Sequence, residues 1–266
     1  MQHIYFGIFQ DFKYLYRQEI LEIGIYDDEF VDFYNMINAS DDEINKYNDF
    51  IQPHGKSILE LCCGNGRLTI PLAKLGYRID GYDISIDMLS VLKNKIQSLS
   101  TDIQSNIQCK IGNVFDIVVE KKYDCIILPA STISILSDNV NKLINLFNKI
   151  SGWLKKDGIF IFDYNIYISE KSKSELSSIA QKNNTYSRWI CFQDFINYIP
   201  GRAIGNFYIQ KEYKEGTSRK YITSTNKRII TKDFIQNIVD ISQLKLIYQE
   251  PMEGNSNSIV NILKAK

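Results

Sequence analysis

Residues 57–73, SILELCCGNGRLTIPLA, place an acid, two cysteines and two glycines between an apolar run and a helical pattern. Three kinds of site could use such a loop: a zinc or redox cysteine pair, a dinucleotide-binding turn, or a turn that holds another nucleoside cofactor. A strand that runs into glycines and then into a helix brings backbone N–H groups and a helix N-terminus close to a ligand. The rest of the chain decides between the three.

The cysteine and histidine content argues against the first alternative. Of the five cysteines only Cys62 and Cys63 are neighbours, no CxxC spacing occurs, and the chain has just two histidines. A Cys/His zinc site therefore has few ligands to draw on. We expect reduced, packed thiols and no metal site.

The glycine spacing argues against the second alternative. Read from Gly64, the dinucleotide fingerprint GxGxxG becomes GNGRLT, so that Thr69 stands where a third glycine or alanine is needed. The sequence GK[ST] of a P-loop is also absent. A nicotinamide oxidoreductase is therefore a weakened hypothesis.

Residues that follow the next two expected strands suit a nucleoside. Asp83 ends the second strand, where a carboxylate can accept hydrogen bonds from both ribose hydroxyls. Ile84 and Met88 follow, and they could lie against a purine face. Asn113 comes just after the third strand, where its side-chain oxygen could accept a hydrogen bond from an adenine amino group, and Val114 adds a backbone amide and an apolar wall. The loop therefore fits the third alternative.

The elements that must position these residues alternate between strand and helix. Such alternation predicts a doubly wound, Rossmann-like, mostly parallel sheet with right-handed crossovers, which places ligands at the carboxyl ends of the strands. We expect an α/β fold with seven strands. The expected strands are residues 57–61, 77–83, 107–111, 123–129, 158–164, 244–250 and 258–265, and the expected helices between them are 67–75, 85–99, 138–154 and 231–241.

The chain outside this pattern predicts two further parts. Residues 1–56 read as an N-terminal helical lid, with a helix over residues 1–24 and a capping box, SDDE, that opens a second helix at Ser40. Residues 165–230 begin with a polar stretch and then contain three β-like segments, which we expect to form an inserted antiparallel ribbon. The core is then residues 57–164 and 231–266.

The overall composition limits which kinds of binding partner we expect. The chain of 266 residues has 31 basic and 31 acidic side chains, and no apolar run approaches the roughly 18 residues that span a membrane. Its N-terminus lacks signal-peptide features, so we expect a cytoplasmic protein without a membrane partner. Residues 19–49 carry ten acids and one base, whereas residues 211–232 carry seven basic residues and two acids. A nucleic-acid partner is disfavoured because the totals balance.

Five segments in order, ILELCCGNGR, GYDISIDML, GNVFDI, YDCIILP and LKKDGIFIFDYN, resemble the successive motifs of class I S-adenosylmethionine-dependent methyltransferases. The resemblance covers residues 57–164 and, more loosely, 231–266. It implies that the acidic glycine loop holds the methionine part of S-adenosylmethionine, with Cys62 in place of the first loop glycine, and that Asp83 holds the ribose. The expected cofactor-binding residues are Tyr34, Glu60, Cys62, Gly64, Gly66, Asp83, Ile84, Met88, Asn113, Val114 and Leu128.

The acceptor is the least determined part of the reading. Asp163 and Tyr164 end the fifth strand beside the expected methyl group, and we expect them to be the catalytic or substrate-contacting residues. The layout resembles small-molecule methyltransferases, including those that dimethylate amino sugars and peptide natural products. The leading hypothesis is N-methylation of a small molecule or small peptide; O- or C-methylation, or nucleoside binding without turnover, remain open. The ribbon could roof the acceptor pocket or form a homodimer contact.

Overall fold

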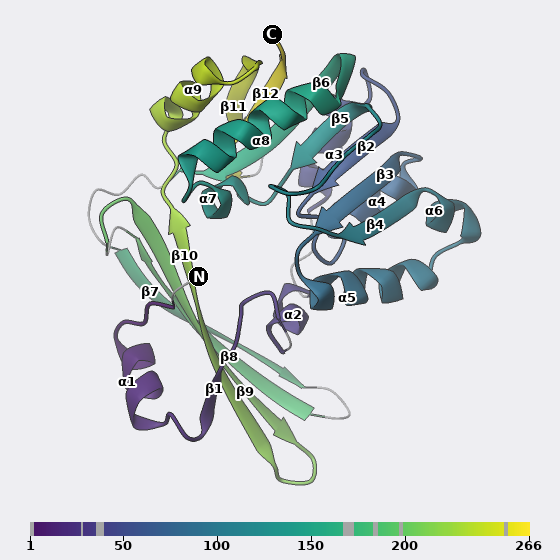
Figure 1. Ribbon diagram of the computed structural model, residues 1–266. Coiled ribbons are helices and arrows are strands. Elements are labelled where there is room, and N and C mark those ends of the chain that lie inside the picture. The colour runs from purple at the N-terminus through teal and green to yellow at the C-terminus, as the bar shows by residue number, and fades with distance from the viewer. Residues whose placement is uncertain are drawn as a thin grey trace. The chain divides into compact units, whose positions relative to one another are not determined.

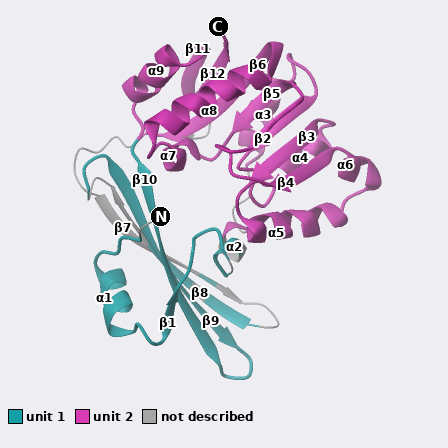
Figure 2. Cartoon of the chain, in the orientation of Figure 1, with its two compact units in different colours: residues 1–33, 167–229 teal, residues 34–166, 230–266 magenta. Residues whose placement is uncertain are grey.

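The structure, a computed structural model, describes residues 3–27, 29–35, 40–166, 173–182, 186–196, 199–252 and 255–266. The chain divides into two compact units (Figure 2). Unit 1 contains residues 1–33 and 167–229, and unit 2 contains residues 34–166 and 230–266. The segment expected to form the lid is therefore shared between the units, because residues 34–56 group with the core.

Unit 2 is built on a seven-stranded sheet in the order β11-β12-β6-β5-β2-β3-β4 (Figure 1). Strands β4, β3, β2, β5 and β6 run parallel, and β12 is antiparallel to both of its neighbours. The doubly wound α/β prediction is confirmed. The strand bounds are β2 Ser57–Leu61, β3 Arg78–Asp83, β4 Ile107–Ile111, β5 Tyr123–Leu128, β6 Leu154–Asn165, β11 Leu244–Met252 and β12 Asn255–Ala265.

Side-chain caps start several helices of this unit. Ser40 accepts a hydrogen bond from the backbone N–H of Glu43 at 3.1 Å, as the capping box predicts, and Ser85 accepts one from Met88. Each cap satisfies an N–H group that has no partner within its own helix. The helices are α3 Asp41–Ile51, α4 Thr69–Lys74, α5 Ile86–Gln97, α6 Thr101–Ser105, α7 Ile133–Leu136, α8 Val140–Trp153 and α9 Lys232–Ile241.

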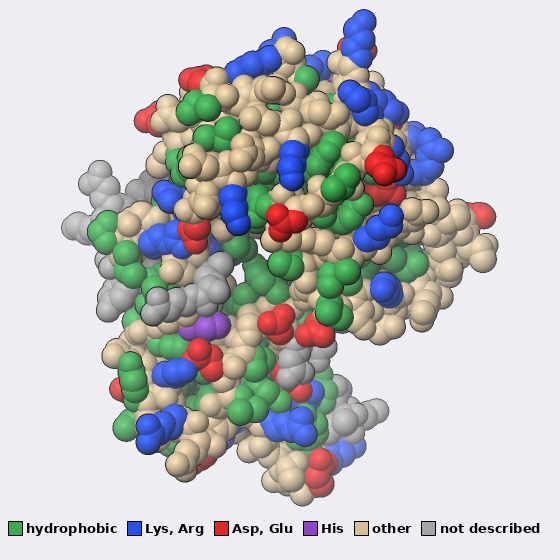
Figure 3. Space-filling model, viewed as in Figure 1, with side chains coloured by type: hydrophobic (Ala, Val, Ile, Leu, Met, Phe, Trp, Pro, Cys, Tyr) green, Lys and Arg blue, Asp and Glu red, His purple; other side chains and the backbone are tan. Residues whose placement is uncertain are grey.

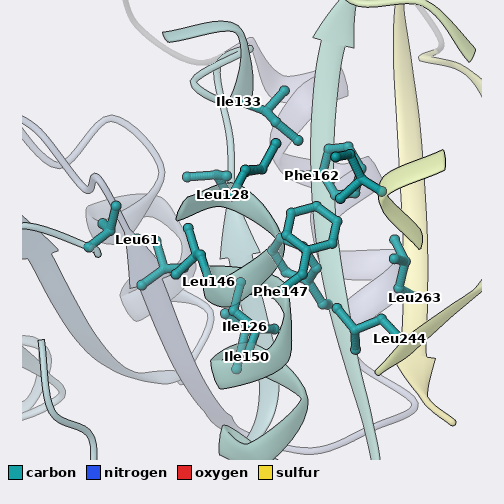
Figure 4. Close-up of a cluster of buried hydrophobic side chains, with 14 of the residues drawn as sticks. Leu61, Ile126, Leu128, Ile133, Leu146, Phe147, Ile150, Phe162, Leu244 and Leu263 are labelled. Atoms are coloured by element: carbon teal, nitrogen blue, oxygen red, sulfur yellow. The ribbon is translucent and has the colours of Figure 1, made fainter. Parts of the chain in front are cut away.

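The central strands are apolar on both faces, as strands covered on both sides must be. On one face Ile126 and Phe162 pack with α8 and α9, in the cluster drawn in Figure 4. On the other face Ile127 and Ile161 pack with α3 and α4. Because alternate residues of a strand point to opposite faces, Asp163 lies on the face of α3 and Tyr164 on the face of α8. This alternation decides the surroundings of the two predicted catalytic residues.

Unit 1 is a five-stranded sheet in the order β1-β10-β9-β8-β7, and all its pairs are antiparallel except β1 with β10. Phe9 of α1 and Ile20 of β1 pack against Tyr208 and Ile222. The antiparallel part agrees with the ribbon expected from the sequence. The bounds are α1 Ile8–Leu15, β1 Ile20–Glu22, α2 Glu29–Tyr34, β7 Lys173–Lys182, β8 Tyr186–Ile196, β9 Arg202–Tyr213 and β10 Ser218–Arg228.

Two predictions of local structure were wrong. The helix expected over residues 1–24 is confined to Ile8–Leu15, and Ile20–Glu22 is a strand that pairs with β10. The polar stretch at the start of the insertion also contains a strand, Lys173–Lys182, which pairs with β8 over ten residues. The partner of β1 lies about 200 positions away, so local pattern carries no information about it, whereas β7 pairs with the next strand despite its polar sequence.

Candidate functional site

The glycine loop between β2 and α4 contains three residues in the left-handed region. Cys62, Gly64 and Gly66 have φ values of 58°, 54° and 81°. The loop is held at both ends, because the N–H of Cys63 donates to the carbonyl of Tyr82 at 3.1 Å and that of Gly66 donates back to Cys63 at 3.0 Å. Cys62 therefore adopts the conformation that glycine would favour, at the strain expected of a side chain there. All five cysteines are free thiols.

Glu60 lies beneath this loop with 1% of its surface exposed. Its carboxylate accepts a hydrogen bond from the hydroxyl of Thr69 at 2.6 Å. Burial raises the pKa of Glu60 to about 7, although the hydrogen bond from Thr69 and the charge of Arg67 favour the ionised form. Thr69, which breaks the dinucleotide fingerprint, thus donates a hydrogen bond to the buried Glu60.

Asp83 organises the other side of the loop. One carboxylate oxygen accepts from the N–H of Gly64 and the other from the N–H of Ser85, each at 2.8 Å. Burial raises the pKa of Asp83, while these hydrogen bonds lower it. The backbone N–H of Ile84 is a third donor, so about one of the roughly four acceptor positions of the carboxylate is left for a ribose hydroxyl. The carboxylate both shapes the loop and is available to a ligand.

The atoms around Gly64 show whether the loop suits a nucleoside. A Cβ atom placed there would lie 3.1 Å from Cε of Met88 and 4.0 Å from an oxygen of Asp83, so the absence of a side chain allows Met88 to approach the loop this closely beside the carboxylate. Met88 is 6% exposed and Ile84 is 66% exposed. An apolar side chain next to a carboxylate is the surface that an adenosine requires, and the residues present therefore fit the cofactor.

The remaining residues predicted to hold the nucleoside have local roles. The side-chain oxygen of Asn113 accepts from the N–H of Phe115 at 3.1 Å, which leaves it one lone pair. Val114 is 3% exposed and Leu128 is fully buried in the core cluster (Figure 4). A contact between Leu128 and a ligand would therefore involve its backbone.

Tyr34 is half-buried and ends α2. The next residue, Asn35, accepts a hydrogen bond from the side chain of Asn65 at 3.0 Å. Asn65 is 4% exposed, and its carbonyl accepts from Lys95 at 3.1 Å. The segment that carries Tyr34 therefore contacts the glycine loop directly, although Tyr34 itself stays a prediction.

Asp163 and Tyr164 are buried at the end of β6, with 5% and 0% exposed. Asp163 accepts three hydrogen bonds: one from the hydroxyl of Tyr47 at 3.0 Å, and two from Ser131, from its N–H at 2.8 Å and its hydroxyl at 3.2 Å. The hydroxyl of Tyr164 has no hydrogen-bond partner, and burial raises its pKa to about 12. The two neighbours therefore differ, because the carboxylate of Asp163 accepts three hydrogen bonds and the hydroxyl of Tyr164 makes none.

Sequence reasoning missed several residues that hold the site together. The sequence patterns do not single out Tyr47, nor do they predict the ion pair of Glu43 with Arg67, which includes a 2.8 Å contact to Nη2. Arg67 directly follows the glycine loop and Glu43 belongs to the capping box. Both residues are charged and lie in or beside a recognised motif, and that position is the signal by which sequence reasoning could have found them.

Neither a membrane-spanning helix nor a cluster of metal ligands occurs in the parts of the chain that the structure describes. Within these ranges no helix is long and apolar enough to cross a membrane. Over the same residues, no group of three His, Cys, Asp or Glu side chains is placed to hold a metal ion. A cavity of about 400 Å³ against β3 and β4, which includes Tyr82 and Lys110 in its lining, contains none of the predicted site residues.

The sheet order, the glycine loop and the carboxylate at the end of β3 together define the fold of class I methyltransferases, which use S-adenosylmethionine. A family model described as "Methyltransferase domain" matches residues 53–231. The chain belongs to this family.

Sequence relatives agree with the family. The chain is 28% identical over 128 residues to YqeM of Bacillus subtilis (strain 168), which is named as an unverified methyltransferase, and this match covers 48% of the chain and 50% of that protein. It is 27% identical over 197 residues to the demethylmenaquinone methyltransferase of Lactobacillus johnsonii, which covers 72% of each. The chain spans about half the length of the first curated relatives it matches.

Solved structures share the fold over nearly the whole chain. The CcbJ methyltransferase from Streptomyces caelestis has a TM-score of 0.70 at 16% identity and covers 91% of this chain and 98% of its own. The glycopeptide N-methyltransferase MtfA with S-adenosylmethionine has a TM-score of 0.62 at 16% identity, with 92% of each chain covered. At such identities the likeness establishes the fold alone.

Proposed function

We propose that this protein transfers a methyl group from S-adenosylmethionine to a nitrogen atom of a small molecule or small peptide. The observation that carries the cofactor assignment is the hydrogen bond from the Gly64 N–H to Asp83 with Met88 close to Gly64, which brings a carboxylate and an apolar side chain together at the glycine loop. The acceptor class is supported by the fold neighbours, which include the sugar N-methyltransferase KedS8, with a TM-score of 0.73 at 11% identity, and MtfA.

S-adenosylmethionine, when bound, supplies an electrophilic methyl group. In the proposed arrangement Asp83 would hold the ribose hydroxyls, and the loop that contains Glu60 would hold the methionine part. An amine can accept the methyl group only with its lone pair exposed, so it must first lose a proton and its hydration. Positioning and removal of water are therefore the main tasks of this chain.

Tyr164 is our candidate for contact with the acceptor. Its hydroxyl is buried and unpaired, which is unusual enough to call for a partner. A pKa of about 12 keeps the hydroxyl protonated at neutral pH, so it would orient an amine by hydrogen bonding and would not act as a base. Replacing Tyr164 with phenylalanine should then raise the KM for the acceptor and leave cofactor affinity unchanged.

The distribution of charge favours a small acceptor over a nucleic acid. On the face seen in Figure 3, Lys and Arg side chains are scattered among acidic, apolar and other polar side chains. A nucleic-acid surface would gather them into a patch or stripe. The alternatives are O- or C-methylation of a small metabolite and nucleoside binding without turnover. The turnover assay below distinguishes them from N-methylation.

Calorimetric titration with S-adenosylmethionine, S-adenosylhomocysteine and NADPH tests the cofactor assignment first. We expect micromolar binding of both sulfur nucleosides, at least a tenfold loss of affinity in Asp83→Asn, and no binding of NADPH. Asp80→Asn is the matched control, because Asp80 lies on the same strand and bonds to Tyr123. Absence of binding by either sulfur nucleoside would refute the proposal.

Turnover is then measured as formation of S-adenosylhomocysteine with panels of amines and of alcohols. Consumption with amines alone supports N-methylation, and consumption with alcohols alone favours the O-methyltransferase alternative. Cofactor binding without consumption in either panel would favour a nucleoside-binding protein without turnover.

A further inference from the structure

The loop that follows β5 is strained next to the predicted acceptor position. Ala130 and Ser131 are consecutive non-glycine residues in the left-handed region, with φ values of 62° and 54°. Each such residue is strained and persists only where its surroundings enforce the conformation. Strain of this kind gathers at functional sites, so the contacts that enforce it identify residues that matter to the site.

Asp163 provides those contacts. Its Oδ2 accepts both the N–H and the hydroxyl of Ser131, at 2.8 and 3.2 Å, and fixes that residue in its left-handed conformation. Within the loop, the hydroxyl of Thr132 donates to the carbonyl of Pro129 at 2.6 Å. The turn is therefore closed locally and is anchored to β6 through a single carboxylate.

Tyr47 fixes that carboxylate from the opposite side. Its hydroxyl donates to Oδ1 of Asp163 at 3.0 Å, and the ring of Tyr47 is 1% exposed in the core beneath α3. With three donors on a 5% exposed carboxylate, Asp163 is oriented for bonding within the protein and has little freedom to move toward a substrate.

Helix α3 connects this anchor to the cofactor loop. Glu43 lies one turn before Tyr47, on the same side of the helix, and binds Arg67 through both carboxylate oxygens. One helix thus holds the glycine loop at its first turn and the 129–132 loop at its second. A displacement of α3 would move both loops.

We infer that Tyr47 and Asp163 are positioning residues, which act through Ser131 to hold the 129–132 loop in the conformation that receives the methyl acceptor. The inference rests on the proposed methyl transfer and assigns Asp163 a role different from proton abstraction. The cofactor loop is held separately, by Glu43 and Arg67, so loss of the Tyr47 hydroxyl should affect the acceptor and spare the cofactor.

Tyr47→Phe is the variant that tests this, with Tyr77→Phe as its matched control. Tyr77 is also buried in the same cluster and donates to a residue of α3, Asn48, at 2.7 Å, but it contacts neither loop. We expect Tyr47→Phe to raise the acceptor KM and lower kcat, by at least tenfold in kcat/KM, with S-adenosylmethionine affinity within twofold of wild type. Tyr77→Phe should leave both kinetic parameters unchanged.

A readout that needs no acceptor keeps the inference separate from the proposed function. Hydrogen exchange of the Ser131 amide should become at least tenfold faster in Tyr47→Phe and stay unchanged in Tyr77→Phe. Unchanged exchange in Tyr47→Phe would overturn the inference, whether or not an acceptor has been found. Absence of turnover in the wild type, with faster exchange in Tyr47→Phe, would instead count against the proposed function alone.

A second variant pair separates positioning from simple stabilisation. Asp163→Asn leaves a single side-chain oxygen, which cannot accept from Tyr47 and Ser131 at the same time, and should lower both the Tm and turnover. Adding Ser131→Gly relieves the left-handed strain, so the double variant should recover Tm while turnover stays at least tenfold below wild type. Recovery of turnover together with Tm would overturn the inference, because Asp163 would then serve only the stability of the loop.

Discussion

At the scale of single residues, the buried acid of the cofactor loop determines the pH dependence of stability. Burial raises the folded-state pKa of Glu60 from 4.5 to about 7, so between these values the folded protein binds more protons than the unfolded chain. The contribution of Glu60 to stability is therefore complete below about pH 4.5 and is lost as the pH rises through 7. The shift corresponds to about 3 kcal/mol.

We predict that the free energy of unfolding falls between pH 5 and pH 8 in wild type, and that this fall is about 3 kcal/mol smaller in Glu60→Gln, which keeps an oxygen for Thr69. Urea titrations at several pH values measure both slopes. Thr69→Val is the companion variant, since it removes the hydrogen bond that favours the ionised form and should steepen the fall. Parallel slopes in wild type and Glu60→Gln would contradict the assignment.

The residues that the sequence could predict are those within one strand–loop–helix unit. Glu60, Gly64 and Thr69 lie within ten positions, and the link from Gly64 to Asp83 joins two adjacent parallel strands. The link from Tyr47 to Asp163 spans 116 positions and that from Ser131 to Asp163 spans 32. No spacing rule relates such residues, because their contact depends on how α3 packs on the sheet.

At the scale of elements, the dependence on contacts between distant parts of the chain also explains which strands the sequence predicts. Strand β5 is apolar apart from Asp124 and is evident from composition, since it is covered on both faces. Strand β1 has three residues and becomes a strand only by pairing parallel with β10, some 200 positions away. Aromatic residues at helical spacing around it favoured a single long helix, and tertiary pairing overrode that preference.

The packing of β3 against its neighbours gives a prediction at this scale. A Cβ atom on Gly81 would lie 2.8 Å from the sulfur atoms of both Cys63 and Cys109, a distance that real side chains do not tolerate. We expect Gly81→Ala to reduce stability by about 1–3 kcal/mol through overpacking. It should also weaken S-adenosylmethionine binding, because Cys63 belongs to the cofactor loop.

Chemical denaturation of a double-mutant cycle checks the cause. Cys109→Ala in the Gly81→Ala background should restore at least 0.5 kcal/mol, since it removes one of the two clashing sulfur atoms. Gly152→Ala is the matched control: nothing lies within 4 Å of the added Cβ in α8, so alanine should stabilise that helix by up to about 1 kcal/mol. Additive effects of Gly81→Ala and Cys109→Ala would exclude the clash.

At the scale of the whole molecule, each unit has its own core. The sheet of unit 2 is packed on both faces, while Phe9, Cys191, Tyr208 and Ile222 form a separate cluster in unit 1. Unit 1 also encloses charges: Glu29 of α2 binds Lys211 at 2.9 Å and Arg188 at 3.3 Å, and all three residues are at most 9% exposed. Every residue predicted to hold the cofactor lies in unit 2.

This division predicts that damage to unit 1 leaves cofactor binding intact. Glu29→Gln removes the negative partner of two buried cations, a change that typically costs about 3–5 kcal/mol. We expect limited proteolysis to cleave residues 1–33 and 167–229 faster in this variant, with S-adenosylmethionine affinity within twofold of wild type. Glu19→Gln, which breaks the exposed pair with Lys220 in the same unit, should change stability by less than about 1 kcal/mol. Loss of cofactor affinity in step with proteolysis of unit 1 would mean that the two units unfold as one, because the core of unit 2 would then depend on that of unit 1.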